Sequence, residues 1–359
     1  FDKVDIDERV IEKAAGILDR IYDKKYGGFG DSPKFPMPHY LLFLLDYAKN
    51  NNNDKYLNMV ETTLQNMRAG GIYDQLGQGF HRYSTDQKWE VPHFEKMLYD
   101  QALLIYTYLE TYRETNKRLY RDVVEEIIGY LKRDMLSETG GFYAAEDADS
   151  DGEEGKYYYW NLSELENILT KEEYDKFLSV FAIDDEKKIN LRLKNVKDYK
   201  SITNIKQKLL DEREKRTRPG RDNKILTDWN GLTVAALAKA GFVFNKEEYI
   251  KLAEKTLSFI DKKMKSDKKK LAHSYCNGKV TEYSNLDDYS FYLWGLIELH
   301  QATLKEKYIN KAVEIAEEMI KLFWDEKEGG FYYTTKENQE LFLRQKDTAD
   351  SAIPAGNSL

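Results

Sequence analysis

Residues Gly70 to Leu104 concentrate side chains that can transfer protons or bind polar ligands beside aromatic rings. The stretch holds two of the five histidines of the chain. Its polar and aromatic residues of interest are Asp74, Gln75, His81, Arg82, Tyr83, Asp86, Trp89, His93, Glu95 and Asp100. Histidine can act as an acid or a base near neutral pH, and arginine can hold a carboxylate or polarise a sugar oxygen. This density favours a pocket wall, and the alternative is a hydrogen-bonded cluster that braces a long loop.

An acidic segment from Glu146 to Gly152 is a second candidate. Its alternating aspartates and Gly152 match the start of a calcium-binding loop, but the twelfth position is Tyr158, where such a loop needs glutamate. We therefore favour a solvated acidic turn and predict no metal site, with calcium binding as the alternative. Glu146 and Asp147 precede the tip of the turn, so a pocket could use either one as an acid or a base.

Two further polar groups lie where apolar helices are expected to begin. They are Asp228-Trp229-Asn230 and Asp287-Asp288-Tyr289. Aspartates at these positions could stabilise the positive end of a helix or present a catalytic carboxylate. For the first group, a helix N-cap at Thr227 or Asp228 is a strong alternative.

These positions allow two kinds of reaction. An epimerase would pair His81 with His273, which lies on a short extended segment, as proton donor and acceptor. A glycoside hydrolase would use two carboxylates, whose separation indicates the stereochemical outcome. The candidate pairs are Asp100 or Glu146 with Asp228 or Asp288. The candidate catalytic residues are His81, Asp100, Glu146, Asp228, Asp288 and His273. The candidate substrate-binding residues are Arg82, Tyr83, Trp89, His93, Glu95, Trp229, Asn230 and Tyr289.

Composition narrows the class of protein. The chain has 359 residues, of which 41% are hydrophobic, so it can form a large core. Its net charge of −8 argues against a nucleic-acid groove as the main surface. The chain has a single cysteine, so we predict no internal disulfide. It has no run of about 18 apolar residues, so we predict no membrane span. No leader is visible, so we predict a location in the cytoplasm. No P-loop, GxSxG, paired CxxC or HExxH motif is present, and we expect no cofactor.

The apolar periodicity is helical over most of the chain. The expected helices are 4–22, 41–48, 56–67, 95–114, 120–136, 163–169, 172–181, 205–216, 229–244, 249–264, 286–303 and 308–323. Ser163 and Thr170 are expected N-caps. The segment Gly140 to Trp160 predicts a β-hairpin with aromatic runs in its strands, and Asp184 to Lys200 predicts a charged surface loop.

Strongly apolar helices alternate with amphipathic ones along the chain. This pattern predicts an inner ring of helices that is packed on all sides and an outer ring of helices that each expose one face to solvent. We therefore predict an all-α fold, an α/α toroid with short β-hairpins at its loop end, as a single domain over residues 1–359. The residues from Ile353 to Leu359 resemble the approach to another helix, so we expect the domain to continue with further helices.

Long segments of the chain carry a family resemblance. They are GGFGDSPKFPMP at 27–38, the stretch 70–104, GGFYAAEDADSDGEEGKYYYW at 140–160, KILTDWNGL at 224–232 and RQKDTADSAIPAGNSL at 344–359. Together they resemble the spermatogenesis-associated, thioredoxin-domain-containing proteins and their bacterial YyaL-like relatives. The segment 186–195 departs from the family pattern, where a Gly-Asn turn is usual.

The resemblance implies both a partner and a pocket. Members of the family usually carry an N-terminal thioredoxin-like domain, so this chain looks like their second domain. That second domain is similar to six-hairpin glycosidase-like toroids near the N-acylglucosamine 2-epimerase group, which implies an (α/α)6 barrel that binds a sugar. We therefore expect an epimerase or a hydrolase that uses acid/base chemistry. The alternative is a non-catalytic module that binds a glycan or a protein and serves the thioredoxin-like domain, because fold does not imply function.

Overall fold

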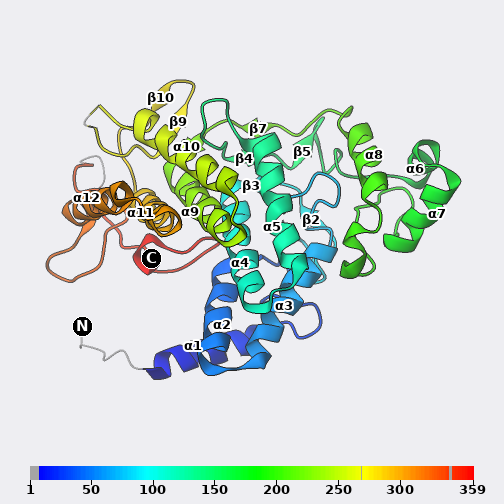
Figure 1. The fold of residues 1–359 in the computed structure, drawn as a ribbon, viewed down its shortest axis with the longest axis horizontal. Helices are drawn as coiled ribbons and strands as arrows, with labels where there is room; N and C mark the ends of the chain where they lie inside the picture. The colour runs from blue at the N-terminus through cyan, green and yellow to red at the C-terminus, as the bar shows by residue number, and fades with distance from the viewer. Residues whose placement is uncertain (1–7, 268, 339–341) are drawn as a thin grey trace. The chain divides into compact units, whose positions relative to one another are not determined.

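The computed structural model describes residues 8–267, 269–338 and 342–359, and it is mainly helical (Figure 1). The α-helices are α1 (Glu8–Ile21), α2 (Pro38–Asn51), α3 (Asp54–Ala69), α4 (Leu98–Thr115), α5 (Arg118–Tyr130), α6 (Leu162–Ile168), α7 (Lys171–Val180), α8 (Thr203–Arg213), α9 (Thr227–Phe244), α10 (Glu247–Lys263), α11 (Leu286–Thr303) and α12 (Glu306–Phe323). The strands are β1 (Tyr83–Ser84), β2 (Pro92–His93), β3 (Lys96–Met97), β4 (Ala145–Glu146), β5 (Asp149–Ser150), β6 (Glu153–Glu154), β7 (Arg221–Asp222), β8 (Ile225–Leu226), β9 (Ser274–Cys276) and β10 (Lys279–Val280). The predicted all-α class is confirmed, and each helix expected within the described residues is present.

The described residues form two compact units. The first unit comprises residues 8–94, 110–116 and 148–218, and the second unit comprises the described residues of 95–109, 117–147 and 219–359. Helix α4 contributes residues to both. Among the described helices, none combines the length and the apolar character that crossing a membrane requires.

The hairpin predicted at the acidic turn of 140–160 is present, but its strands are shorter than predicted. The segment 140–160 does not form a hairpin whose strands carry the aromatic runs. The strands β5 and β6 are acidic and pair across a tight turn at Asp151 and Gly152, which both have positive φ. Tyr157 and Tyr158 follow this hairpin and are buried in a small apolar cluster with Phe94. The two tyrosines lie outside the strands because the hairpin ends at Glu154, and their rings pack in the core.

The expected surface loop from Asp184 to Lys200 also differs from the prediction. Ile189 and Leu193 are buried, and they form isolated β-bridges with Trp160 and Phe181. Charged residues surround these apolar residues in the sequence, so the segment shows no apolar periodicity that would have predicted their burial. A 3-10 turn, Val196–Lys200, completes the segment.

The two predicted caps have different outcomes. The prediction for Ser163 is wrong, because Asn161 caps α6 and its side chain accepts a hydrogen bond from the backbone N–H of Glu164. The prediction for Thr170 is confirmed, since Thr170 and Glu173 form a reciprocal capping box at the start of α7.

Helices α9 and α11 pack directly against each other in the second unit. Two glycines lie at their contact. A Cβ atom at Gly231 would lie 2.6 Å from the backbone carbonyl carbon of Phe291, and one at Gly295 would lie 2.9 Å from the carbonyl oxygen of Gly231. Real Cβ atoms do not approach backbone so closely, so the two helix backbones touch here only because both positions lack a side chain.

Amphipathic helices cover this pair. Helix α10 packs against α9, and α12 packs against α11. Nearly every residue of α9 is buried, whereas α10 buries one face and leaves its charged residues exposed. The predicted alternation of fully packed and one-sided helices is therefore present in this unit.

Replacing Gly231 with alanine should destabilise the protein by about 1–3 kcal/mol, because the new methyl group would meet the backbone of α11 and force the helices apart. Urea-induced unfolding measures the effect. The matched control is Gly16→Ala in α1, where a Cβ atom meets nothing within 4 Å and the higher helix propensity of alanine should stabilise by up to about 1 kcal/mol. Equal stability of Gly231→Ala and the wild type would contradict the close helix contact.

Candidate functional site

The predicted site residues are divided between the two units. The first unit contains His81, Arg82, Tyr83, Trp89 and His93. The second unit contains Glu95, Asp100, Glu146, Asp228, Trp229, Asn230, His273, Asp288 and Tyr289. Each group is therefore described within its own unit.

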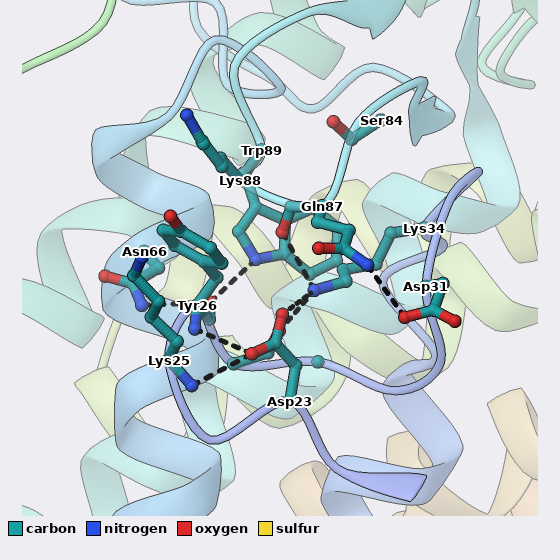
Figure 2. Close-up of polar contacts among 12 residues, drawn as sticks. Asp23, Lys25, Tyr26, Asp31, Lys34, Asn66, Ser84, Gln87, Lys88 and Trp89 are labelled. Carbon is teal, nitrogen blue, oxygen red and sulfur yellow. Dashed lines mark hydrogen bonds and ion pairs between the residues drawn. The ribbon is translucent and has the colours of Figure 1, made fainter.

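In the first unit, a buried lysine braces the loop that carries Trp89 (Figure 2). Lys34 has no exposed side-chain surface, and its ammonium group donates to the Asp23 carboxylate at 2.6 Å and to the Gln87 carbonyl oxygen at 2.8 Å. The Trp89 side chain is also fully buried, and its Nε1–H donates to the carbonyl oxygen of Tyr26 at 3.0 Å. A covered indole offers no face to a sugar, so Trp89 here holds two loops together.

The two histidines of the 70–104 stretch have local partners in the same unit. His81 is 1% exposed, and its Nδ1 lies 2.8 Å from the carbonyl oxygen of Phe94. A carbonyl oxygen only accepts, so Nδ1 carries the hydrogen and donates. His93 is paired with Glu154 at 2.8 Å and stacks on Tyr83 with ring centroids 5.0 Å apart. These contacts favour the alternative reading of the stretch, in which its polar groups brace a loop.

In the second unit, a short strand pair places His273 next to the start of α9. Strand β8 directly precedes α9, and its Leu226 pairs with Ser274 of β9. The backbone N–H of Thr227 then donates to the carbonyl oxygen of His273 at 2.9 Å. His273 therefore lies beside the first turn of α9, which carries Asp228.

Asp288 joins three elements at this point. It completes a capping box at the start of α11, where its Oδ2 accepts from the backbone N–H of Asn285 at 2.7 Å. Its Oδ1 accepts from the backbone N–H of Asp228 at 3.2 Å, and Nδ1 of His273 lies 3.0 and 3.2 Å from its two oxygens. The Asp288 side chain has no exposed surface. It therefore positions its neighbours and does not meet a ligand itself.

Two protons are held at this group. Burial, and next the charge of Asp288, raise the pKa of Asp228 well above its usual value. The hydrogen bond to Asp288 is the main cause that raises the pKa of His273 to about 9. Asp228 is 5% exposed and the His273 side chain is 31% exposed. The group thus offers proton donors that can be approached from the side of His273.

Asp228, His273 and Asp288 are also residue types that bind divalent metals, and their side-chain ligand atoms lie within 4.8 Å of one another. However, both oxygens of Asp288 already accept backbone hydrogen bonds, from the N–H groups of Asn285 and Asp228, and Nδ1 of His273 also faces them. We therefore interpret the group as a site of proton transfer.

The N-cap alternative for α9 is wrong. The cap residue is Leu226, which makes no side-chain capping bond, and Thr227 and Asp228 lie within the first turn. The Thr227 hydroxyl instead donates to the carbonyl oxygen of Ala272 at 2.6 Å. Asp228 accepts only from the next backbone N–H, that of Trp229, among the hydrogen bonds identified.

Some predicted residues of the second unit lie in its core. They are Asp100, Glu146, Asn230 and Tyr289. Asn230 accepts from the Phe142 backbone N–H at 2.7 Å and donates back to the Phe142 carbonyl oxygen at 3.0 Å. Glu146 accepts from the Tyr130 hydroxyl at 2.7 Å. These contacts hold the chain around the helix starts.

Two neighbours complete the group: Asp287, which the sequence singled out together with Asp288, and Tyr333, which was missed as a site residue. The backbone N–H of Gly356 donates to Asp287 at 2.9 Å, and burial raises the pKa of Asp287 to about 6. Burial raises the pKa of Tyr333, and the charges of Asp287, Asp228 and Asp288 raise it further, so Tyr333 lies within their electrostatic reach. The Gly-Gly-Phe-Tyr-Tyr motif at 329–333 was the available signal for Tyr333.

A cavity of about 410 Å³ lies in the second unit. Its lining residues are Glu95, Met97, Ala144, Ala145, Asp147, Gly220, Arg221, Asp222, Lys224, Leu226 and Trp229. Asp228 does not line the cavity itself, but Leu226 and Trp229 flank it in the chain. Trp229 is half-buried, and Tyr99 packs edge-on against it with ring centroids 4.8 Å apart.

The cavity lies along one small sheet. Strands β3, β4 and β7 pair in the order β3-β4-β7 and contribute lining residues. Sequence reasoning named Glu95 and Trp229 as substrate-binding residues but missed Arg221 and Asp222. The turn signal at Pro219-Gly220, directly before the charged β7 segment, could have pointed to them.

Comparison with known proteins identifies relatives over most of the chain. No protein-family model matches it. Spermatogenesis-associated protein 20 from Rattus norvegicus is 33% identical over 95% of this chain, and the Homo sapiens protein of that name is equally similar. This chain is a homologue of spermatogenesis-associated protein 20. It spans about half the length of these relatives, 50% and 51% respectively.

Solved structures show the fold. The glycoside hydrolase family 76 mannosidase from Bacteroides thetaiotaomicron has a TM-score of 0.57 at 11% identity, covering 95% of this chain and 76% of its own. The unsaturated glucuronyl hydrolase specific for heparin has a TM-score of 0.50 at 12% identity, covering 83% and 69%. The homologue of spermatogenesis-associated protein 20 therefore has the predicted six-hairpin α/α toroid fold.

The protonation of His273 is directly testable. NMR titration of the wild type, with the signal assigned by His273→Gln, should give a midpoint near pH 9. This folded-state pKa lies above the ordinary histidine value of about 6.5. The bound proton therefore stabilises the folded protein fully below about pH 6.5, and this stabilisation is lost as the pH rises through about 9. Asp288→Asn should move the midpoint down toward 6.5. A wild-type midpoint near 6.5 would contradict the contact with Asp288.

Proposed function

We propose that the second unit is a carbohydrate-active domain in which Asp228 donates a proton to the glycosidic oxygen of a sugar substrate. The observation that carries this proposal is the buried Asp228 carboxyl, whose raised pKa keeps it protonated beside His273 and Asp288. Glycoside hydrolysis needs such an acid, because the departing sugar oxygen must be protonated as its bond breaks.

Each member of the group has a distinct role in this proposal. Asp228 is the general acid. Asp288 is a positioning residue that fixes the Nδ1–H of His273, so the ring nitrogen Nε2 remains to exchange a proton with a ligand or with Asp228. The positive charge on His273 stabilises the carboxylate that Asp228 becomes when it gives up its proton, which makes that proton transferable.

A second carboxylate must complete a hydrolytic site. It attacks the sugar or activates a water molecule on the face opposite the acid. The cavity lined by Leu226 and Trp229 also contains the carboxylates of Glu95, Asp147 and Asp222, and one of them would fill this role. The half-buried ring of Trp229 in the same cavity suits the apolar face of a sugar.

The structural neighbours support the substrate class only through their fold. Two of these neighbours are named as a glycoside hydrolase family 76 mannosidase and as an unsaturated glucuronyl hydrolase specific for heparin. The cytoplasm remains the proposed location, and the family resemblance makes a thioredoxin-like domain the proposed partner.

Asp228→Asn should lower the turnover number by about 10²- to 10⁴-fold, because asparagine keeps the shape of the side chain but has no proton to donate. The assay incubates purified protein with mannobiose, mannooligosaccharides and a panel of aryl glycosides and follows the products by NMR. The matched control is Asp211→Asn, an exposed aspartate of α8 in the first unit.

Two results would contradict the proposal. Turnover that survives in Asp228→Asn would exclude this residue as the acid. Sugar binding without hydrolysis or epimerisation of any substrate in the panel would favour the alternative, a non-catalytic glycan-binding module.

A further inference from the structure

Asp287 has one carboxylate oxygen that no group of the described protein uses. Its Oδ1 accepts from the backbone N–H of Gly356 at 2.9 Å, and its Oδ2 makes no hydrogen bond within the described residues. The residue is only 8% exposed, yet Oδ2 is not among the enclosed side-chain atoms without a partner, so it keeps some exposed surface. Because burying a carboxylate is costly unless its oxygens find donors, this oxygen suits a ligand that supplies one.

Tyr333 brings a hydroxyl group to the start of the same helix. Its backbone carbonyl oxygen accepts from the N–H of Leu286 at 2.8 Å, and its own N–H donates to the carbonyl oxygen of Gln345 at 2.7 Å. Leu286 is the first residue of α11 and directly precedes Asp287, so the backbone of Tyr333 is fixed beside the site. The Tyr333 side chain is half-buried, and its hydroxyl has no hydrogen-bond partner in the part of the chain that the structure describes.

The two side chains share one electrostatic environment. After burial, the negative charge of Asp287 is the strongest influence that raises the pKa of Tyr333, and the charges of Asp228 and Asp288 follow. The phenol therefore keeps its proton at neutral pH and remains a hydrogen-bond donor. Since it donates to none of these three carboxyl groups, its proton is available to a ligand.

Two further atoms of the group are unbonded. They are Oδ2 of Asp228 and Nε2 of His273, which make no hydrogen bond to any described residue. The other oxygen of Asp228 accepts from Trp229, and the other ring nitrogen of His273 faces Asp288. A sugar suits this mixture of free donors and acceptors, because each of its hydroxyl groups can both donate and accept.

We propose that Asp287 and Tyr333 are sugar-binding residues of this site, in which Oδ2 of Asp287 accepts from a substrate hydroxyl and the Tyr333 hydroxyl donates to a substrate oxygen. The inference rests on the proposed function, because it names the groups that recognise the substrate of Asp228. Neither residue lines the cavity that contains Trp229, so the pair contacts a different part of the ligand from the indole ring.

Both residues can be changed without removing an interaction that holds the fold. Tyr333→Phe deletes only the unbonded hydroxyl. Asp287→Asn keeps an oxygen that can accept from Gly356, and it removes a negative charge that is repelled by Asp288 and Asp347. Both variants should therefore unfold in urea at the wild-type midpoint or above it, so a loss of affinity reports a lost contact with the ligand.

The test measures mannobiose binding by isothermal titration calorimetry, with the full chain carrying Asp228→Asn so that turnover does not interfere. Adding Asp287→Asn should weaken binding by about tenfold or more, because a hydrogen bond to a charged group is lost. Adding Tyr333→Phe should weaken it by about fivefold, because the lost hydrogen bond joins neutral groups.

Two matched controls come from the first unit. Tyr47→Phe removes the hydroxyl of another half-buried tyrosine, which packs on Tyr56 and whose hydroxyl also makes no hydrogen bond among the described residues. Asp211→Asn removes the charge of an exposed aspartate. Each should change the affinity for mannobiose by less than about twofold, since neither residue belongs to the site.

The dependence of binding on pH separates a ligand contact from a structural role. Burial raises the pKa of Asp287 to about 6, and the hydrogen bond from Gly356 and the charges of Asp288, Asp347 and His273 also act on it. Because protonation removes the charge of the accepting oxygen, affinity should fall as the pH is lowered through about 6. His273, whose pKa is about 9, stays protonated over this range. Adding Asp287→Asn should abolish the fall.

Three outcomes would overturn the inference. They are no mannobiose binding, an affinity within about twofold of that of the Asp228→Asn protein when either Asp287→Asn or Tyr333→Phe is added, or an unchanged fall at acid pH with Asp287→Asn. Failure of the proposed function gives a different result. In that case mannobiose binds and responds to both substitutions as expected, but protein with Asp228 intact does not cleave it.

Discussion

The close contact of α9 and α11 is the constraint on which the candidate site depends. Gly231 and Gly295 allow the two backbones to touch, so the first turns of both helices come within hydrogen-bonding distance. The backbone N–H of Asp228 then reaches the carboxylate of Asp288 at 3.2 Å. A side chain at either glycine would separate the helices and remove the low-dielectric neighbourhood in which Asp228 keeps its proton.

Short strands position the neighbours of Asp228 that the contact between the two helices does not position. The pairing of β8 with β9 brings His273 to Asp288, and the β3-β4-β7 sheet lines the cavity beside Trp229. These strands are only two or three residues long, and β8 directly precedes the start of α9, which carries Asp228. The rigid helices thus fix the acid, while the strands place its neighbours and the binding surface.

The sequence predicts the helical framework and three members of the site. Apolar periodicity gives α11 its observed bounds, and Asp228, Asp288 and His273 all stand out by residue type and position. The sequence does not show that Trp89 is covered or that His81 donates to a backbone carbonyl, because a polar residue that braces a loop looks the same as one that binds a ligand. Arg221 and Asp222 escape notice because their role depends on a two-residue strand that periodicity cannot detect.

The central claim is that Asp228 holds a proton in the folded protein because it is buried beside Asp288. Infrared difference spectroscopy between the wild type and Asp228→Asn at about pH 6 tests this directly, since a protonated carboxyl has a carbonyl stretch distinct from that of a carboxylate. At this pH an ordinary aspartate, with a pKa of about 3.9, is ionised. The account predicts a protonated-carboxyl band in the wild type that is absent from Asp228→Asn. A difference spectrum that shows only the loss of a carboxylate band would contradict it.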